Sequence, residues 1–104
     1  MIVVGGDAFV DLIDRGQRVF EAYPGGSTFN CAVAAGLLGS QVLYVSTLST
    51  DPYGDLLVNR LTECNVQIRP DARSDANTSL AIVSFDDFSQ PSYAFYRKGT
   101  ADRE

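Results

Sequence analysis

The first part of the chain places short apolar runs between turn residues. Residues 2–4 are apolar and β-branched and are followed by two glycines, Gly5 and Gly6. Such a run predicts a strand that is buried on both faces and that ends where the backbone must approach another group closely. Residues 8–13 and 18–22 are strand-like on either side of a turn, so we expect them to form a β-hairpin.

A helix with little polar surface is expected next. Residues 23–26 have the composition of a loop, and Ser27 or Thr28 is suited to cap the helix that follows. That helix is predicted over residues 29–38, with Gly39 as its C-terminal stop. Its residues are apolar or small almost all the way round, which predicts that it lies deep in a larger fold.

A buried strand over residues 41–46 follows this helix. The order strand, hairpin, helix, strand predicts an α/β fold in which two parallel strands are joined by a crossover helix. Two helices and a few strands cannot cover both faces of a parallel sheet, although such sheets are normally covered on both. We therefore expect the missing cover to come from residues absent here or from a second copy of the chain.

The remaining sequence predicts one more helix and one more hairpin. Residues 53–64 carry apolar side chains at helical spacing, and Asn65 is placed to end this helix. Residues 69–77 are polar enough to be a surface loop. Residues 78–85 and 91–97 have the pattern of two antiparallel strands. Residues 98–104 show no core pattern.

The composition of the chain argues against nucleic acid and membranes as partners. The chain has 104 residues, a net charge of -5 and no cluster of Lys or Arg, which argues against a nucleic-acid surface. It shows no basic and apolar leader and no apolar run of about 20 residues, so we expect no membrane partner and a cytoplasmic protein. Cys31 and Cys64 have no metal-ligand spacing and are expected to be reduced and buried. The chain is short for an enzyme that must hold two substrates.

The most specific motif is the glycine pair at the start of the first helix. Gly25 and Gly26 let the backbone come close to a ligand, and the free amides of a helix start favour polar oxygen. The side chain of Asn30, one turn further on, is expected to point back toward the N-terminus of the helix, where its amide offers both donors and an acceptor to a hydroxyl group. Taken alone, this pattern fits a structural turn as well as a binding site.

This motif, with the small-residue helix and the Leu-Gly that closes it, resembles the N-terminal signature of the ribokinase-like (PfkB) carbohydrate kinases. The similarity extends over essentially all 104 residues. Outside the motif it includes Gly6-Asp7 with Asp11, Asp51-Pro52-Tyr53-Gly54, Thr78, Tyr96-Arg97 and Ala101-Asp102. The resemblance implies a partial ribokinase-like fold, with residues 1–104 as the N-terminal part of a kinase domain.

The resemblance also implies a set of sugar-binding residues. Asp11 would accept hydrogen bonds from sugar hydroxyls, which suits a carboxylate because charge-assisted bonds are strong. Gly25, Gly26 and Asn30 would contact the same sugar. Arg97 corresponds to an arginine near the sugar pocket of fructokinase-like members, and a surface charge at a strand end is an equally good interpretation.

The family further implies a small β lid over the sugar. The lid would consist of residues 8–22 and 78–97, and the α/β part of residues 2–7 and 25–68. Relatives often pair two lids, so we expect a homodimer. The aromatic residues of the second hairpin could serve either as dimer contacts or as pocket walls; these are Tyr93, Phe95 and Tyr96.

Parts of the family's machinery are not found in the sequence. The Gly-Ala-Gly-Asp-like turn that supplies the general base and holds the developing phosphate charge is missing, and no GxxxxGK[ST] replaces it. We therefore assign no catalytic, cofactor-binding or metal-binding residue. ATP and Mg²⁺ are expected for a full-length enzyme about three times as long, of which this chain would be a truncated part.

Three functions are weighed on this basis. The first is phosphorylation of a primary hydroxyl on a small sugar, with fructose favoured, to which this chain contributes sugar binding but no activity of its own. The second is a non-catalytic sugar-binding or dimerisation module derived from the same family. The third is a nucleotide-binding α/β domain of another family, suggested by the glycines after the first strand, although GxGxxG is absent.

Overall fold

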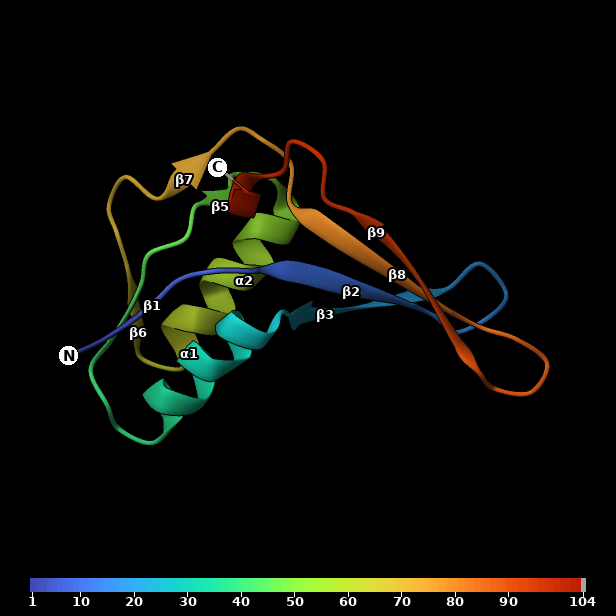
Figure 1. Cartoon of the computed structure of the whole chain (residues 1–104), viewed down its shortest axis with the longest axis horizontal. Coiled ribbons are helices and arrows are strands. Elements are labelled where there is room, and N and C mark those ends of the chain that lie inside the picture. The colour runs from blue at the N-terminus through green and yellow to red at the C-terminus, as the bar shows by residue number, and fades with distance from the viewer. Residues whose placement is uncertain (104) are drawn as a thin grey trace.

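The computed structural model describes residues 1–103, which form a helical part and a long, thin sheet that extends away from it (Figure 1). The helical part contains a three-stranded parallel sheet in the order β1-β4-β6. Its elements are β1 (Ile2–Val4), α1 (Ser27–Leu37), β4 (Val42–Tyr44), α2 (Pro52–Glu63) and β6 (Val66–Ile68). The expected parallel pair with its crossover helix, β1-α1-β4, is confirmed.

The long sheet has four strands in the order β3-β2-β8-β9. Its strands are β2 (Phe9–Asp14), β3 (Phe20–Gly25), β8 (Ser79–Phe85) and β9 (Pro91–Tyr96). β2–β3 and β8–β9 are the two predicted antiparallel hairpins, and β2 and β8 join them in parallel. Sequence segments about seventy residues apart thus form one continuous lid sheet, which projects to the right in Figure 1.

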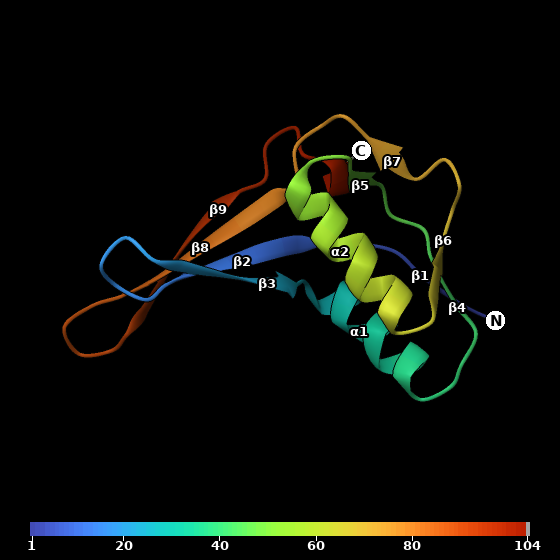
Figure 2. The same cartoon turned by 180° about the vertical axis from the view of Figure 1, so that it is seen from behind.

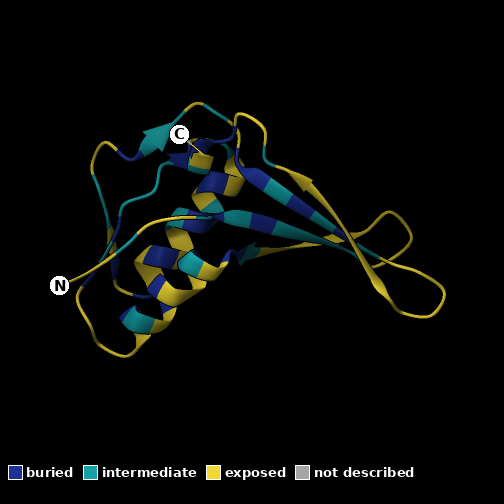
Figure 3. Ribbon diagram, in the orientation of Figure 1, coloured by how far each residue is buried: buried dark blue, intermediate teal, exposed yellow. Residues whose placement is uncertain are grey.

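Burial is confined to one side of the small parallel sheet. Both helices lie in front of β1, β4 and β6 in Figure 2. The core that they enclose contains Phe29, Tyr44, Leu57 and Leu61. Figure 3 shows buried and exposed stretches alternating along both helices. The prediction that β1 is buried on both faces is wrong, because Val3 is 62% exposed. No described element covers the other face of this sheet, as the element count led us to expect.

Helix α1 departs from the prediction at its start and in its burial. It begins at Ser27, with Gly26 as its N-cap and no capping side chain, so neither Ser27 nor Thr28 caps it. One stripe of the helix is buried, at Phe29, Ala32, Val33 and Gly36. The opposite face is open in this chain, and its burial within a larger fold stays a prediction. Cys64 is buried as expected, whereas the expectation that Cys31 is buried is wrong, because Cys31 is exposed.

The expected loop at residues 23–26 is mostly strand. Residues 23–25 continue β3, and Pro24 pairs with Val10. A proline is tolerated there because β3 is an edge strand, whose outward amides need no partner. The first hairpin therefore runs directly into α1, with only Gly26 between them.

Two segments predicted to lack core structure carry some. Within the expected surface loop at residues 69–77, β7 (Arg73–Ser74) pairs in parallel with β5 (Leu48–Ser49), and Ala72 is buried. At the C-terminal end, the 3₁₀ helix η1 (Ala101–Arg103) has a buried Ala101. Both result from contacts across the fold, which a local periodicity does not record.

Helix α2 agrees with its prediction. Asp51 caps it by accepting a hydrogen bond from the amide of Gly54, and Pro52 occupies its first turn. Asn65 adopts a positive φ of 62° immediately after the helix, as expected for its end. Neither this helix nor α1 is long and apolar enough to cross a membrane.

Candidate functional site

Asp11 and Gly25 are in direct contact across the first hairpin. Asp11 pairs with Tyr23 on β3, and its carboxylate Oδ2 lies 2.6 Å from the position that a Cβ on Gly25 would occupy. A side chain at Gly25 would therefore displace the carboxylate. Burial raises the pKa of Asp11, because a partly buried environment disfavours the charged form.

Gly26 brings the start of α1 against residues 5–8, the crossing that connects β1 to β2. Its φ is 105°, and a Cβ there would lie 2.6 Å from the carbonyl oxygen of Asp7. The hydroxyl of Thr28 donates to that same oxygen at 2.9 Å. Because no side chain caps α1, amides of its first turn remain available to a ligand oxygen.

The crossing itself is held by two hydroxyl groups on and after β4. Tyr44 donates toward the carbonyl oxygens of Gly6 and Asp7, each at 3.2 Å. The Ser46 hydroxyl accepts from the Gly6 amide at 2.6 Å and lies 2.8 Å from the Gly6 carbonyl oxygen. Burial raises the pKa of Tyr44 to about 12, so this donor stays protonated at neutral pH.

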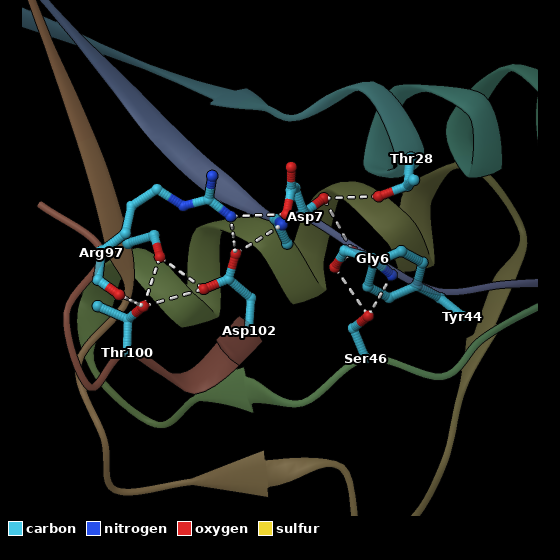
Figure 4. Close-up of polar contacts among 10 residues, drawn as sticks. Gly6, Asp7, Thr28, Tyr44, Ser46, Arg97, Thr100 and Asp102 are labelled. Atoms are coloured by element: carbon cyan, nitrogen blue, oxygen red, sulfur yellow. Dashed lines mark hydrogen bonds and ion pairs between the residues drawn. The ribbon is translucent and has the colours of Figure 1, made fainter. Parts of the chain in front are cut away.

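Arg97, at the end of β9, reaches the same crossing (Figure 4). Its Nη2 lies 2.6 Å from Asp7 Oδ1 and 3.4 Å from Asp102 Oδ2. The hydrogen bond with Asp7 is the main cause that raises the pKa of Arg97. Its guanidinium carbon sits 5.8 Å from the centre of the Phe9 ring, and its Nε is buried without a hydrogen-bond partner in the described chain.

Asp102 is the polar centre of this region, and sequence reasoning assigned it no role. Its side chain is 1% exposed. Besides Arg97, Oδ2 accepts from the amide of Ala8 at 3.1 Å, while the hydroxyls of Ser79 and Thr100 lie 2.5 and 3.1 Å from Oδ1. The only signal for Asp102 in the sequence was its place in the Ala-Asp pair quoted for the resemblance, because residues 98–104 have no core pattern of their own.

The structure links four of the five predicted residues by contacts that run through Asp7 and Phe9. Gly26 touches Asp7, Arg97 binds Asp7 and covers Phe9, and the Gly25 Cβ position lies 3.2 Å from the Phe9 ring as well as beside Asp11. The remaining residue, Asn30, is exposed in the first turn of α1, and its backbone N–H donates to the Gly26 carbonyl oxygen at 2.9 Å.

A hollow of about 540 Å³ lies between the end of β9 and the start of α2. Among the five predicted residues, it is lined by Arg97 alone. Its other walls are Asp51, Tyr53, Asn77, Thr78, Leu80, Phe95, Tyr96, Lys98 and Thr100. A single cavity shared by the side chains of Asp11 and Asn30 therefore stays a prediction.

The chemistry of the arrangement suits hydroxyl-rich ligands. The carboxylate of Asp11 can accept hydrogen bonds from hydroxyls, while free helix amides and the guanidinium of Arg97 can donate to their oxygens. Within residues 1–103, no group of three or more His, Cys, Asp or Glu side chains could hold a metal ion.

Comparison with known proteins adds the family. A family model described as pfkB family carbohydrate kinase matches residues 1–104. A fructokinase from Rhizobium leguminosarum bv. trifolii is 35% identical over 107 residues, covering 99% of this chain and 32% of that protein.

Solved structures show the same fold. The crystal structure of a fructokinase with bound ATP from Xylella fastidiosa superposes with a TM-score of 0.86 at 32% identity, over 97% of this chain and 34% of that one. A ribokinase from Thermotoga maritima superposes with a TM-score of 0.77 at 20% identity, over 92% and 36%. The predicted ribokinase-like fold is thus confirmed, and this chain spans about a third of the length of these relatives.

Proposed function

Since this chain belongs to the pfkB family of carbohydrate kinases, we propose that it is the sugar-binding part of an enzyme that phosphorylates a primary hydroxyl of a small sugar. Fructose is the favoured substrate, followed by 2-keto-3-deoxygluconate, ribose and nucleosides. The protein would act in the cytoplasm.

The observation that carries this proposal is the contact of Asp11 with Gly25 at the start of α1. The contact holds a hydrogen-bond acceptor against Gly25, two residues before α1 begins, and no side chain caps that helix. A sugar hydroxyl can donate to the carboxylate while its oxygen accepts from such an amide. In this proposal Asp11, Gly25, Gly26 and Asn30 bind the sugar, and Arg97 closes the site from the lid.

ATP supplies the phosphoryl group in this family proposal, and Mg²⁺ would neutralise its phosphates. The described residues do not fit a Mg²⁺ site, since they include no cluster of acidic side chains able to hold a metal ion. The Gly-Ala-Gly-Asp-like turn is also missing from this sequence, so we propose that the general base and the ATP site belong to other parts of the full-length protein. Residues 1–104 by themselves would be inactive.

The test is an ATP-dependent phosphorylation assay of the full-length protein on a panel of neutral sugars, sugar acids and nucleosides. Asp11→Asn should raise KM for the sugar at least about tenfold, because one charge-assisted bond is lost. Asp87→Asn makes the same chemical change at the exposed tip of the second hairpin and should leave KM unchanged. A protein that binds ATP but phosphorylates nothing on the panel would refute the proposal.

A second candidate is a non-catalytic sugar-binding or dimerisation module. It is favoured by the exposed aromatic surface of the edge strand β9, where Tyr93 and Phe95 are 59% and 56% exposed and stack at 6.1 Å between ring centres. Exposed aromatic surface of this kind is typical of a protein interface. A lid-mediated homodimer would be compatible with either function.

Sedimentation at high protein concentration tests the dimer, with Tyr93→Ser and Phe95→Ser expected to yield monomers. If the wild-type protein with an intact lid stays monomeric, the dimer is wrong. Kinase activity in the full-length protein would in turn exclude the purely non-catalytic module.

A further inference from the structure

Arg97 is poorly suited to bind an anionic ligand, because carboxylates of the protein already neutralise its positive charge. Its Nη2 faces two carboxylates, at 2.6 Å from Asp7 and 3.4 Å from Asp102. The Arg97 side chain is 22% exposed, so solvent screens this cluster less than it screens a surface ion pair. An incoming carboxylate or phosphate would have to compete with both residues for the same guanidinium.

Asp102 cannot easily leave this arrangement. Its side chain is 1% exposed and accepts from the Ala8 amide through Oδ2, while the Ser79 and Thr100 hydroxyls lie at Oδ1. These donors stabilise the carboxylate and orient it toward Arg97. The pairing of Arg97 with Asp102 is therefore part of the folded site, whereas Asp7 is half-exposed and less constrained.

The local charge is negative even with Arg97 counted. Asp7 lies within residues 7–9, Asp102 binds the Ala8 amide and Asp11 follows two positions later, whereas Arg97 is the cation that the described contacts place against this segment. Lys98 lies further along, in the wall of the neighbouring hollow. A hydroxyl group carries no charge and meets no repulsion here, whereas an anionic group is disfavoured.

We propose that Asp102, with Asp7, makes the site selective for uncharged sugars over sugar acids by neutralising Arg97. Asp102 is a positioning residue in this scheme, since it acts through Arg97 rather than on the sugar. The inference rests on the proposed kinase function and adds to it the charge of the substrate.

The test compares kcat/KM of the full-length protein for D-fructose and for 2-keto-3-deoxygluconate, which carries a carboxylate. Asp102→Asn keeps the size of the side chain and removes its charge. The ratio of acid to neutral sugar should rise about tenfold, mainly through a lower KM for the acid, the order expected when one unit charge near the ligand is removed. The double variant Asp102→Asn/Arg97→Met should lose that gain.

A matched control comes from another arginine–carboxylate pair. Arg73 and Asp55 are also 2.6 Å apart, and Asp55→Asn should leave the sugar ratio unchanged. If Asp102→Asn does not fold, the same sugar ratio is measured on Asp7→Asn. This change removes the charge of the nearer partner of Arg97, and Asp7 is half-exposed.

The outcomes separate the two proposals. A wild-type protein that phosphorylates neither sugar nor any other member of the panel refutes the kinase function. An active protein whose sugar ratio is unchanged by Asp102→Asn, or by Asp7→Asn where that variant decides, refutes the charge selection and leaves the kinase function standing. A gain for the acid that persists without Arg97 also refutes it, because the selection would then not act through the guanidinium.

Discussion

Replacing Gly26 with alanine tests whether the start of α1 depends on its close approach to the backbone of Asp7. A Cβ at this position would lie 2.6 Å from the Asp7 carbonyl oxygen and 3.1 Å from its carbonyl carbon. That oxygen also accepts from the hydroxyls of Thr28 and Tyr44, so it cannot move without breaking other bonds. The variant must shift either α1 or the crossing from β1 to β2.

The expected cost has two parts. A φ of 105° is a region that residues other than glycine rarely adopt, and it costs about 1–3 kcal/mol. The forced backbone shift adds about 1–3 kcal/mol, as for other overpacked sites. The sum is a loss of about 4 kcal/mol in the free energy of unfolding, a large part of the roughly 5–15 kcal/mol that is typical of a domain.

The control is Gly39→Ala. Gly39 also has a positive φ, of 90°, but an alanine Cβ there would meet nothing within 4 Å. It should therefore cost only the conformational part, about 1–2 kcal/mol. The assay is urea denaturation of both full-length variants and the wild type, followed by circular dichroism. Equal losses for the two variants would refute the close-approach argument.

Two further predictions concern carboxylates. Asp51→Ala should lower the free energy of unfolding by about 2–4 kcal/mol, because the cap of α2 is lost and the buried Thr78 amide loses its acceptor. Burial raises the pKa of Asp51, but the hydrogen bonds from Thr78 and Gly54 outweigh this effect, so the net shift is downward. The loss of stability in Asp51→Ala should therefore become smaller when urea denaturation is measured at lower pH. A loss that does not depend on pH would contradict this. For Asp11 the sign is opposite: burial raises its pKa, so the folded state binds the proton more readily and the charged form costs stability at neutral pH. Asp11→Asn should therefore be more stable than the wild type at pH 7 and lose that advantage below the unfolded pKa of Asp, and a variant less stable at pH 7 would show the reasoning wrong.

Local patterns were sufficient for most of the elements. The apolar stripe of α2 and its end at Asn65 were predicted from neighbouring residues, and the structure has both. The cap at Asp51 is equally local but was not predicted. The two hairpins were likewise predicted from alternating strands and turn residues between them. Such signals can be recognised in sequence because neighbouring residues satisfy them.

The site was predicted in part, and only where the motif was local. Gly25, Gly26 and Asn30 lie within six positions, and the resemblance added Asp11 and Arg97. Their roles in sugar binding stay predictions, whereas the structure shows that Gly25 touches Asp11 and that Arg97 is paired with carboxylates.

By itself, the sequence determined the two helices, the two hairpins, their order and the parallel crossover. Only the tertiary structure decided that Asp102 is buried beside Ala8, ninety-four positions away, that one face of β1 and α1 is open, and that β5 pairs with β7. The physical reason is range: secondary structure follows from interactions between near neighbours, whereas burial and charge pairing depend on which distant segments the topology brings together. The burial of the Asp102 side chain depends on Ala8 and Ser79, which are distant in sequence, so its role appears only when the fold brings those segments together.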